Sequence, residues 1–171
     1  MDFFEIVDAR RSVRSYQDRP IEEEKLQAII ATANQAPSAG NLQAYEIYVV
    51  RQKAERVALA SASLSQDFMA GAPVALVFCA HPARAAGRYG ERGRRLYAVQ
   101  DATIACAYAM LAAVALGLST VWIGAFEDDR VSRAIHAPAG HIPVAILPIG
   151  YAAETPARTQ RRDLSDIVHE V

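Results

Sequence analysis

The chain has 171 residues and 52% hydrophobic side chains, the composition of a globular protein rather than of a disordered segment, and we expect a single domain over residues 1–171. Its formal net charge of −1 excludes the basic surface that a dedicated nucleic-acid-binding protein needs. Only two cysteines occur, Cys79 and Cys106, which excludes a disulfide framework and a four-thiolate metal cluster. The first five residues lack the basic and apolar regions of a secretion signal, so we expect a cytoplasmic protein.

Helix caps, apolar periodicity and β-branched runs predict the secondary structure. Asp2 and Glu5 form a capping-box pattern that begins a helix, and Pro20 is expected to open the next one. The apolar run at 74–78 is typical of a central strand buried on both faces. The expected elements, in chain order, are a helix from Asp2 to Arg10-Arg11, a helix from Pro20 to Pro37, a loop at 37–41, a strand at 47–50, a helix at 54–64, a strand at 74–78, an arginine-rich loop and helix start at 84–95, a helix at 96–116, a strand at 120–123, a helix at 128–135, a strand at 144–149 and a polar tail from 152.

This order of elements favours an α+β fold. Helices outnumber strands and do not alternate strictly with them, which is not the pattern of a doubly wound sheet. We therefore expect a mixed central β-sheet flanked by helices. In the tail, the apolar residues Leu164, Ile167 and Val168 offer a docking point.

The alanine-rich helix expected at 96–116 bears on the assembly of the protein. No charged residue occurs from Ala102 to Phe126, a length that could span a bilayer. Gly117 and several polar residues interrupt the run and no basic cluster follows it, so we expect a buried helix, capped by Gly117, and no membrane association. Because this helix is apolar on all sides, it needs cover on all sides. A second copy of the chain could supply that cover, and a homodimer is our hypothesis.

Several familiar motifs are absent from the chain. It has no glycine-rich dinucleotide fingerprint, no phosphate-binding P-loop and no G-x-S-x-G nucleophile elbow. Both cysteines lie in apolar runs, where a thiol is usually an inert small hydrophobe. No metal site is expected, because no ligand spacing relates the four histidines, which are His81, His136, His141 and His169.

A basic segment follows the first helix. Arg10, Arg11 and Arg14 place three guanidinium groups beside the hydroxyl of Ser12, where the helix gives way to extended chain. Guanidinium groups bind phosphate bidentately and a hydroxyl adds a further donor, so a phosphate site is one interpretation. The other is a solvated helix end whose cations pair with the glutamates at 22–24.

Two further segments could approach a flat ligand. Small residues in the loop at 37–43 admit a ligand to the backbone, and Asn41 and Gln43 each offer a donor and an acceptor, although an ordinary helix-to-strand turn uses the same residues. Gly124 would leave backbone N–H groups open to a ligand, and a plain strand exit explains it as well. In the tail, Arg161 and Arg162 form a second basic pair or belong to a solvated end of the chain.

Four segments, taken together and in this order, resemble the nitroreductase family of FMN-dependent oxidoreductases. They span almost the whole chain and are Arg-Arg-Ser-Val-Arg at 10–14, Ala-Pro-Ser-Ala-Gly-Asn-Leu-Gln at 36–43, Gly-Leu-Ser-Thr-Val-Trp-Ile-Gly-Ala-Phe at 117–126 and Arg-Arg-Asp-Leu-Ser-Asp-Ile-Val-His at 161–169. The resemblance implies a nitroreductase-like fold and a homodimer with two FMN sites at the subunit interface. It places the alanine-rich helix at or near that interface.

The resemblance also implies which residues contact the cofactor. Arg10, Arg11 and Ser12 would bind the phosphate and ribityl chain, and Arg14 would lie near the N1–C2=O side of the flavin. Arg161 would return to the phosphate, with Arg162 as the alternative. The remaining contacts would be Pro37, Ser38, Ala39, Gly40 and Asn41 from the other subunit, Gln43 as a further polar contact, and Ile123, Gly124 and Ala125, where the N–H of Gly124 or Ala125 would face flavin N5.

The activity implied by the resemblance is electron transfer from NADH or NADPH through FMN to a nitroaromatic, a quinone or a similar electron-poor substrate, by a ping-pong mechanism. The flavin carries the redox chemistry, so no side chain is assigned as a catalytic acid or base. The alternatives on the same fold are flavin fragmentation, dehalogenation, dehydrogenation and a non-catalytic flavin-binding protein. Four arginines, Arg84, Arg88, Arg92 and Arg95, either meet the phosphates of the nicotinamide cofactor or form a solvated face.

Overall fold

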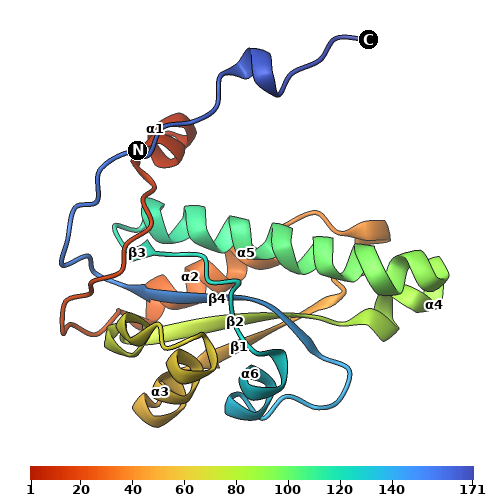
Figure 1. Ribbon diagram of the computed structural model, residues 1–171, viewed down its shortest axis with the longest axis horizontal. Coiled ribbons are helices and arrows are strands. Elements are labelled where there is room, and N and C mark those ends of the chain that lie inside the picture. Colours follow the sequence, from red (N-terminus) through yellow and green to blue (C-terminus); the bar gives the residue numbers. More distant parts are fainter.

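The computed structural model describes residues 1–171 and has helices on both faces of one sheet (Figure 1). The α+β class is therefore confirmed. The helices are α1 (Phe3–Ala9), α2 (Glu23–Asn34), α3 (Lys53–Ala62), α4 (Pro82–Arg92), α5 (Ala98–Ala115) and α6 (Asp128–Ala134). The strands are β1 (Tyr45–Val50), β2 (Val74–Ala80), β3 (Ser119–Thr120) and β4 (Ile142–Gly150). Short 3-10 turns occupy Ala39–Asn41, Asp67–Gly71 and Leu164–Asp166, and a π-helical turn occupies Gly93–Tyr97.

The four strands form one sheet in the order β1-β2-β4-β3. All three strand pairings are antiparallel, and the parallel contact of the sheet is an isolated bridge between Ser12 and Thr120. Every residue of β2 is buried, as its continuous apolar run predicts.

Two hydrophobic cores pack on the two faces of this sheet. α2 and α5 cover one face, where Phe78 belongs to the same cluster as Leu26. α3 and α6 cover the other face, where Val77 clusters with Leu59 and Val131. Neighbouring residues of β2 thus serve opposite cores, because successive side chains of a strand point to opposite faces.

The alanine-rich helix α5 ends where its sequence predicts. Gly117 has a φ of +74°, and its N–H donates to the carbonyl of Val114 while the N–H of Leu118 donates to the carbonyl of Ala113, at 3.0 and 2.8 Å. These two bonds are the Schellman motif. The helical run Pro82–Ala115 is long and apolar enough to cross a membrane, but α5 packs on α2 and on the sheet, which is the situation of a core helix.

The second helix begins later than expected. α2 starts at Glu23 rather than at Pro20, and Glu22 is the residue before its first turn. The carboxylate of Glu22 accepts a hydrogen bond of 2.7 Å from the hydroxyl of Tyr151 and pairs with Lys25. This contact ties Glu22 to the residue that follows β4, and the chain becomes helical only after it.

The arginine-rich stretch, expected to be partly a loop, is helical on both sides of a kink at Gly90. Pro82 occupies the first turn of α4, where its missing N–H is not needed. Gly90 has a φ of +56° and turns the chain so that the π-helical turn packs on α4. A Cβ at Gly93 would lie 2.5 Å from the carbonyl oxygen of Ala85, so only glycine allows this close approach.

Two expectations for the second half of the chain need correction. The third strand is limited to Ser119–Thr120, with one more bridge between Ile123 and Ile146. The apolar tail residues do not dock on their own chain: Leu164 is 73% exposed and Val168 59%. Figure 1 shows the C-terminal segment projecting from the body of the molecule.

Candidate functional site

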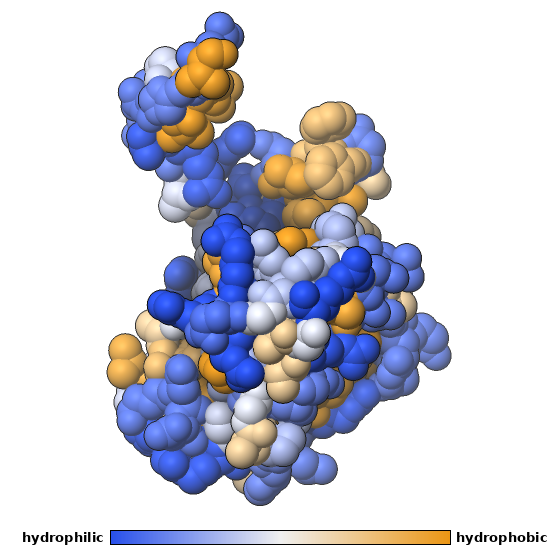
Figure 2. Space-filling view, turned by 90° about the vertical axis from the view of Figure 1, so that its right-hand side faces the viewer, coloured by the Kyte–Doolittle hydropathy of each residue, from blue (hydrophilic) through white to orange (hydrophobic).

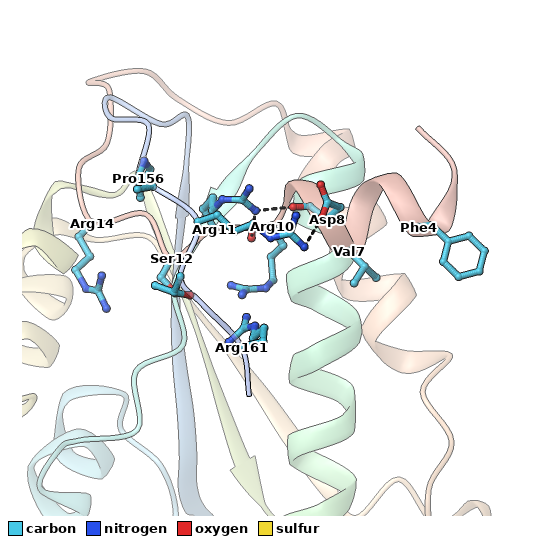
Figure 3. A pocket seen from close by; sticks show the side chains of 12 residues that line it. Phe4, Val7, Asp8, Arg10, Arg11, Ser12, Arg14, Pro156 and Arg161 are labelled. Atoms are coloured by element: carbon cyan, nitrogen blue, oxygen red, sulfur yellow. Dashed lines mark hydrogen bonds and ion pairs between the residues drawn. The ribbon is translucent and has the colours of Figure 1, made fainter. Parts of the chain in front are cut away.

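A basic cavity of about 620 Å³ lies between α1, the segment at 10–14 and the C-terminal segment at 156–161 (Figure 3). It is lined by every residue that the first and last motifs assign to the cofactor, namely Arg10, Arg11, Ser12, Arg14 and Arg161. Because α1 ends at Ala9, the next residues run extended beside β3, where the N–H of Val13 donates to the carbonyl of Thr120 at 3.2 Å. Burial of Val13 anchors this segment, so its polar neighbours can face the cavity.

The guanidinium groups of four arginines in this cavity have no carboxylate partner, although the backbone N–H of Arg14 donates to the carboxylate of Glu154. Arg10, Arg11, Arg14 and Arg161 form no ion pair, whereas Arg158 pairs with Asp8 at 2.7 Å. Arg11 donates only to backbone carbonyls, those of Asp8 and Arg10. The glutamates at 22–24 do not serve the basic segment, since Glu22 pairs with Arg19 and Lys25, and Glu23 with Arg51. The predicted pairing of the basic segment with Glu22 and Glu23 is therefore wrong, whereas Arg14 and Arg161 are exposed to solvent.

Like charges converge in this cavity. Partial burial lowers the pKa of Arg10, and the nearby positive charges of Arg161 and Arg11 lower it further. In Figure 3 the side chains of Arg10 and Arg161 point toward one another, and Arg14 lies apart on the other side of Ser12. Guanidinium groups that converge without an anion are matched to a bound phosphate or carboxylate.

The loop at 37–43 is held partly by its own side chains. The hydroxyl of Ser38 accepts hydrogen bonds from the backbone N–H and the side-chain amide of Gln43, at 3.0 and 3.3 Å. The same amide donates to the side-chain oxygen of Asn41 at 2.6 Å. Gly40, Asn41 and Gln43 all have positive φ values, which are costly for the two residues that carry a Cβ. The surrounding structure must therefore hold this loop in place.

Three residues that we did not assign to the site brace this loop. Asp101 is 2% exposed, and its two carboxylate oxygens accept the N–H groups of Ala39 and Ala44 at 2.9 and 3.2 Å. From α4, Arg84 donates to the carbonyl of Leu42 at 2.6 Å and Arg88 to that of Gly40 at 3.3 Å. These two arginines are thus not simply a solvated face. Asp101 is the one charged residue of α5, a sequence signal that could have identified it.

The loop lines a second cavity of about 480 Å³, separate from the basic one. Pro37, Ser38 and Ala39 face it together with Asp101 and four other residues, Tyr97, Gln100, Thr103 and Ile104. Within one chain, the loop and the arginines therefore do not share a cavity. For the loop and the arginines to contact the same cofactor, the loop would have to come from another subunit. That arrangement stays a prediction.

The segment after β3 lines neither cavity. Ile123 is buried and exchanges backbone hydrogen bonds with Ile146 at 3.0 and 2.9 Å. Gly124 and Ala125 are exposed, and their N–H groups donate to no acceptor in the protein. They remain available to a ligand.

Comparison with known proteins decides the family. The sequence model of the nitroreductase family matches residues 7–66 and 60–151 of the chain. This chain belongs to the nitroreductase family. The resemblance to this family is therefore confirmed, and three of the four sequence segments, those at 10–14, 36–43 and 117–126, lie within the matched residues.

Relatives and solved structures of this nitroreductase-family chain match it over most of its length. A Bacillus subtilis protein named FMN reductase [NAD(P)H] is 31% identical over 94% of this chain and 70% of its own. A Salmonella typhimurium protein named oxygen-insensitive NADPH nitroreductase is 30% identical over 97% of this chain and 72% of its own. The structure of NfrA2 from B. megaterium matches with a TM-score of 0.89 and 29% identity, over 97% of this chain and 72% of that one.

Proposed function

We propose that this protein is an FMN-dependent NAD(P)H oxidoreductase that passes electrons to a nitroaromatic, a quinone or a similar electron-poor acceptor. The observation that carries the proposal is the cavity in which four arginines lack a carboxylate partner, in a chain whose relatives are named for FMN, NAD(P)H and nitro reduction. Bound FMN would accept a hydride from NADH or NADPH and then reduce the second substrate in turn, a ping-pong sequence. The residues of the chain bind, orient and tune the cofactor.

The basic cavity suits the phosphate end of FMN. Arg10, Arg11 and Arg161 offer guanidinium forks, and Ser12 adds a hydroxyl donor. A phosphate dianion there would relieve the mutual repulsion that lowers the pKa of Arg10.

The remaining contacts suit the flavin ring. Arg14 lies apart from the other arginines, and a cation near N1 and C2=O favours the reduced, negatively charged flavin electrostatically. The free N–H groups of Gly124 and Ala125 are donors of the kind that N5 accepts. The loop at 37–43 would cover the ring from the other subunit.

We also propose that the protein is a soluble, cytoplasmic homodimer. An apolar cavity of about 630 Å³ lies between α1, α2 and α5, and Phe4 of α1 is 79% exposed. Figure 2 shows hydrophobic side chains gathered on the two segments that stand above the body of the molecule, α1 and the C-terminal segment. Exposed apolar surface of this kind favours a subunit interface. Light scattering should give the mass of two chains, and a mass of one chain would contradict the dimer.

Two measurements test the proposed activity. The purified protein should be yellow, release FMN when unfolded, and be bleached by NADH or NADPH without oxygen, with colour restored by menadione or a nitrofuran. Arg10→Ala and Ser12→Ala should each weaken FMN binding, roughly 10- to 100-fold for the arginine, while Arg94→Ala, whose side chain pairs with Glu91 outside the cavity, should not.

The outcomes separate the cofactor from the chemistry. Full FMN occupancy in both Arg10→Ala and Ser12→Ala would overturn the assignment of the phosphate site. If FMN binds and neither nicotinamide bleaches it, the reductase proposal is wrong, and the protein is a flavin carrier or performs other flavin chemistry.

A further inference from the structure

Three side chains with metal-ligating atoms meet where β1 and β4 begin and β2 ends. Glu46 lies in β1, His81 directly follows β2, and His141 directly precedes β4. One donor atom from each lies within 4.8 Å of the others. Nδ1 of His81 is 2.9 Å from Oε1 of Glu46, and the two imidazole rings have centroids 4.8 Å apart. Sequence spacing did not indicate this group, because 35 residues separate the first two members.

A one-residue shift in strand register brings the third side chain to this group. Alternation along antiparallel strands places Glu46 and His81 on the α3 and α6 face of the sheet. Along β4, Ala145 and Val144 both pack on the α5 side, where the pairing with β2 shifts by one residue. From Pro143 back to His141, the side chains of β4 therefore point to the opposite faces from those that unbroken alternation would give, and His141 lies on the same face as Glu46 and His81. Without the register shift, His141 would point toward α5.

We propose that Glu46, His81 and His141 form a binding site for a divalent transition-metal ion, best matched by Zn²⁺. Two imidazoles and one carboxylate are a common protein ligand set for zinc, and they leave one coordination position open for water. The side chains of His81 and Glu46 are 29% and 38% exposed, so an ion can enter from solvent. Coordination would require the widest pair of donor atoms to close to about 3.4 Å, the spacing of tetrahedral ligands at about 2.1 Å from zinc, which side-chain rotation can supply.

A second contact holds one of the rings in place. The hydroxyl of Tyr48 lies 2.5 Å from Nδ1 of His141, which leaves Nε2 of that ring for the ion. Metal-bound histidines are usually oriented in this way, through a hydrogen bond at the other ring nitrogen. Tyr48 is thus a positioning residue.

The ion would also brace the start of α4. His81 is the residue before Pro82, and its N–H donates to the carbonyl of Ala44 at 2.9 Å, directly after the loop that Arg84 and Arg88 hold. An ion that binds only the folded chain raises its thermal stability by mass action.

Calorimetric titration of the full-length protein with zinc chloride, after dialysis against a chelator, tests the site. The wild type should bind one ion per chain. A residue that only hydrogen-bonds to a metal ligand typically contributes roughly 10- to 100-fold to the affinity, so Tyr48→Phe should weaken zinc binding within that range. His81→Ala and His141→Ala each remove a ligand and should weaken zinc binding by more. The exposed histidines His136 and His169 supply the controls, since their replacement by alanine should leave the affinity unchanged.

A melting curve and a crystal provide independent measurements. Zinc should raise the melting temperature of the wild type but not that of Glu46→Gln, which keeps the shape of the side chain and loses its charge. Anomalous diffraction at the zinc edge should show one peak among the three side chains. Absence of saturable binding, or binding that survives both His81→Ala and His141→Ala, would overturn the proposal and leave the cluster as a hydrogen-bonded group.

Discussion

The buried carboxylate of Asp101 offers a sharp test of how the loop at 37–43 is held. Its two oxygens accept the N–H groups of Ala39, within the loop, and of Ala44, directly after it, and no cation pairs with the carboxylate. Hydrogen bonds to a charged acceptor contribute about 1.5–3 kcal/mol each. Asp101→Ala removes both, so it should lower the free energy of unfolding by about 3–6 kcal/mol.

A conservative variant keeps the test informative if the alanine variant does not fold, because small proteins have only about 5–15 kcal/mol of stability. Asp101→Asn retains one acceptor oxygen and turns an NH₂ group toward the other N–H. The expected loss is about 1.5–3 kcal/mol, together with weaker FMN binding, because the loop is no longer held in its left-handed conformation.

Urea unfolding followed by circular dichroism measures this loss as a lower midpoint with an unchanged slope. Asp18→Asn makes the same chemical change at an exposed aspartate without a partner and should stay within about 0.5 kcal/mol of the wild type. If Asp101→Asn also stays within about 0.5 kcal/mol, the carboxylate does not hold the loop and the reasoning is refuted.

Three further predictions follow from local geometry. Gly40→Ala should lower the free energy of unfolding by about 1–3 kcal/mol, because its φ is +56° and a Cβ would clash with the hydroxyl of Tyr89. Gly87→Ala, with open space inside α4, should raise the free energy of unfolding by up to about 1 kcal/mol in the same urea assay. Burial raises the pKa of the Cys79 thiol to about 12, so a thiol reagent should label it only after unfolding. The hydroxyl of Tyr151 holds the pKa of Glu22 at about 2, so Tyr151→Phe should raise that pKa in an NMR titration; the stabilisation that this bond provides is present above the ordinary glutamate pKa and is lost as the pH falls toward 2.

Much of the fold could be predicted from the sequence because its signals are local. Asp2 and Glu5 form the capping box at α1 that their spacing predicts, and Gly117 ends α5 as a left-handed cap. The apolar run of β2 is a central strand. The basic segment was also visible, since the residues that line one wall of the cavity are consecutive in the chain.

Contacts between distant segments could not be predicted in this way. Arg84 and Asp101 hold the loop from two different helices, and only the tertiary structure brings them to it. A register shift between β2 and β4 brings His141 to Glu46 and His81, and the hydrophobic periodicity of the sequence does not predict that shift. Each of these cases depends on long-range packing, which overrides what a short window of sequence can indicate.

The chain as a whole is almost neutral, yet its charges are distributed unevenly. Glu22 and Glu23 are engaged by Arg19, Lys25 and Arg51, Asp8 by Arg158, and the carboxylate of Glu154 by the backbone N–H of Arg14, so the guanidinium groups of four arginines in the cavity form no ion pair. Convergent guanidinium groups repel one another, and partial burial strengthens that repulsion because the local dielectric is lower than in water. A bound dianion converts each repulsive pair into attractive contacts with a shared partner. The phosphate of the cofactor would therefore stabilise the fold at the same place where it is recognised, and loss of any one of these arginines should weaken binding more than it destabilises the protein without the cofactor.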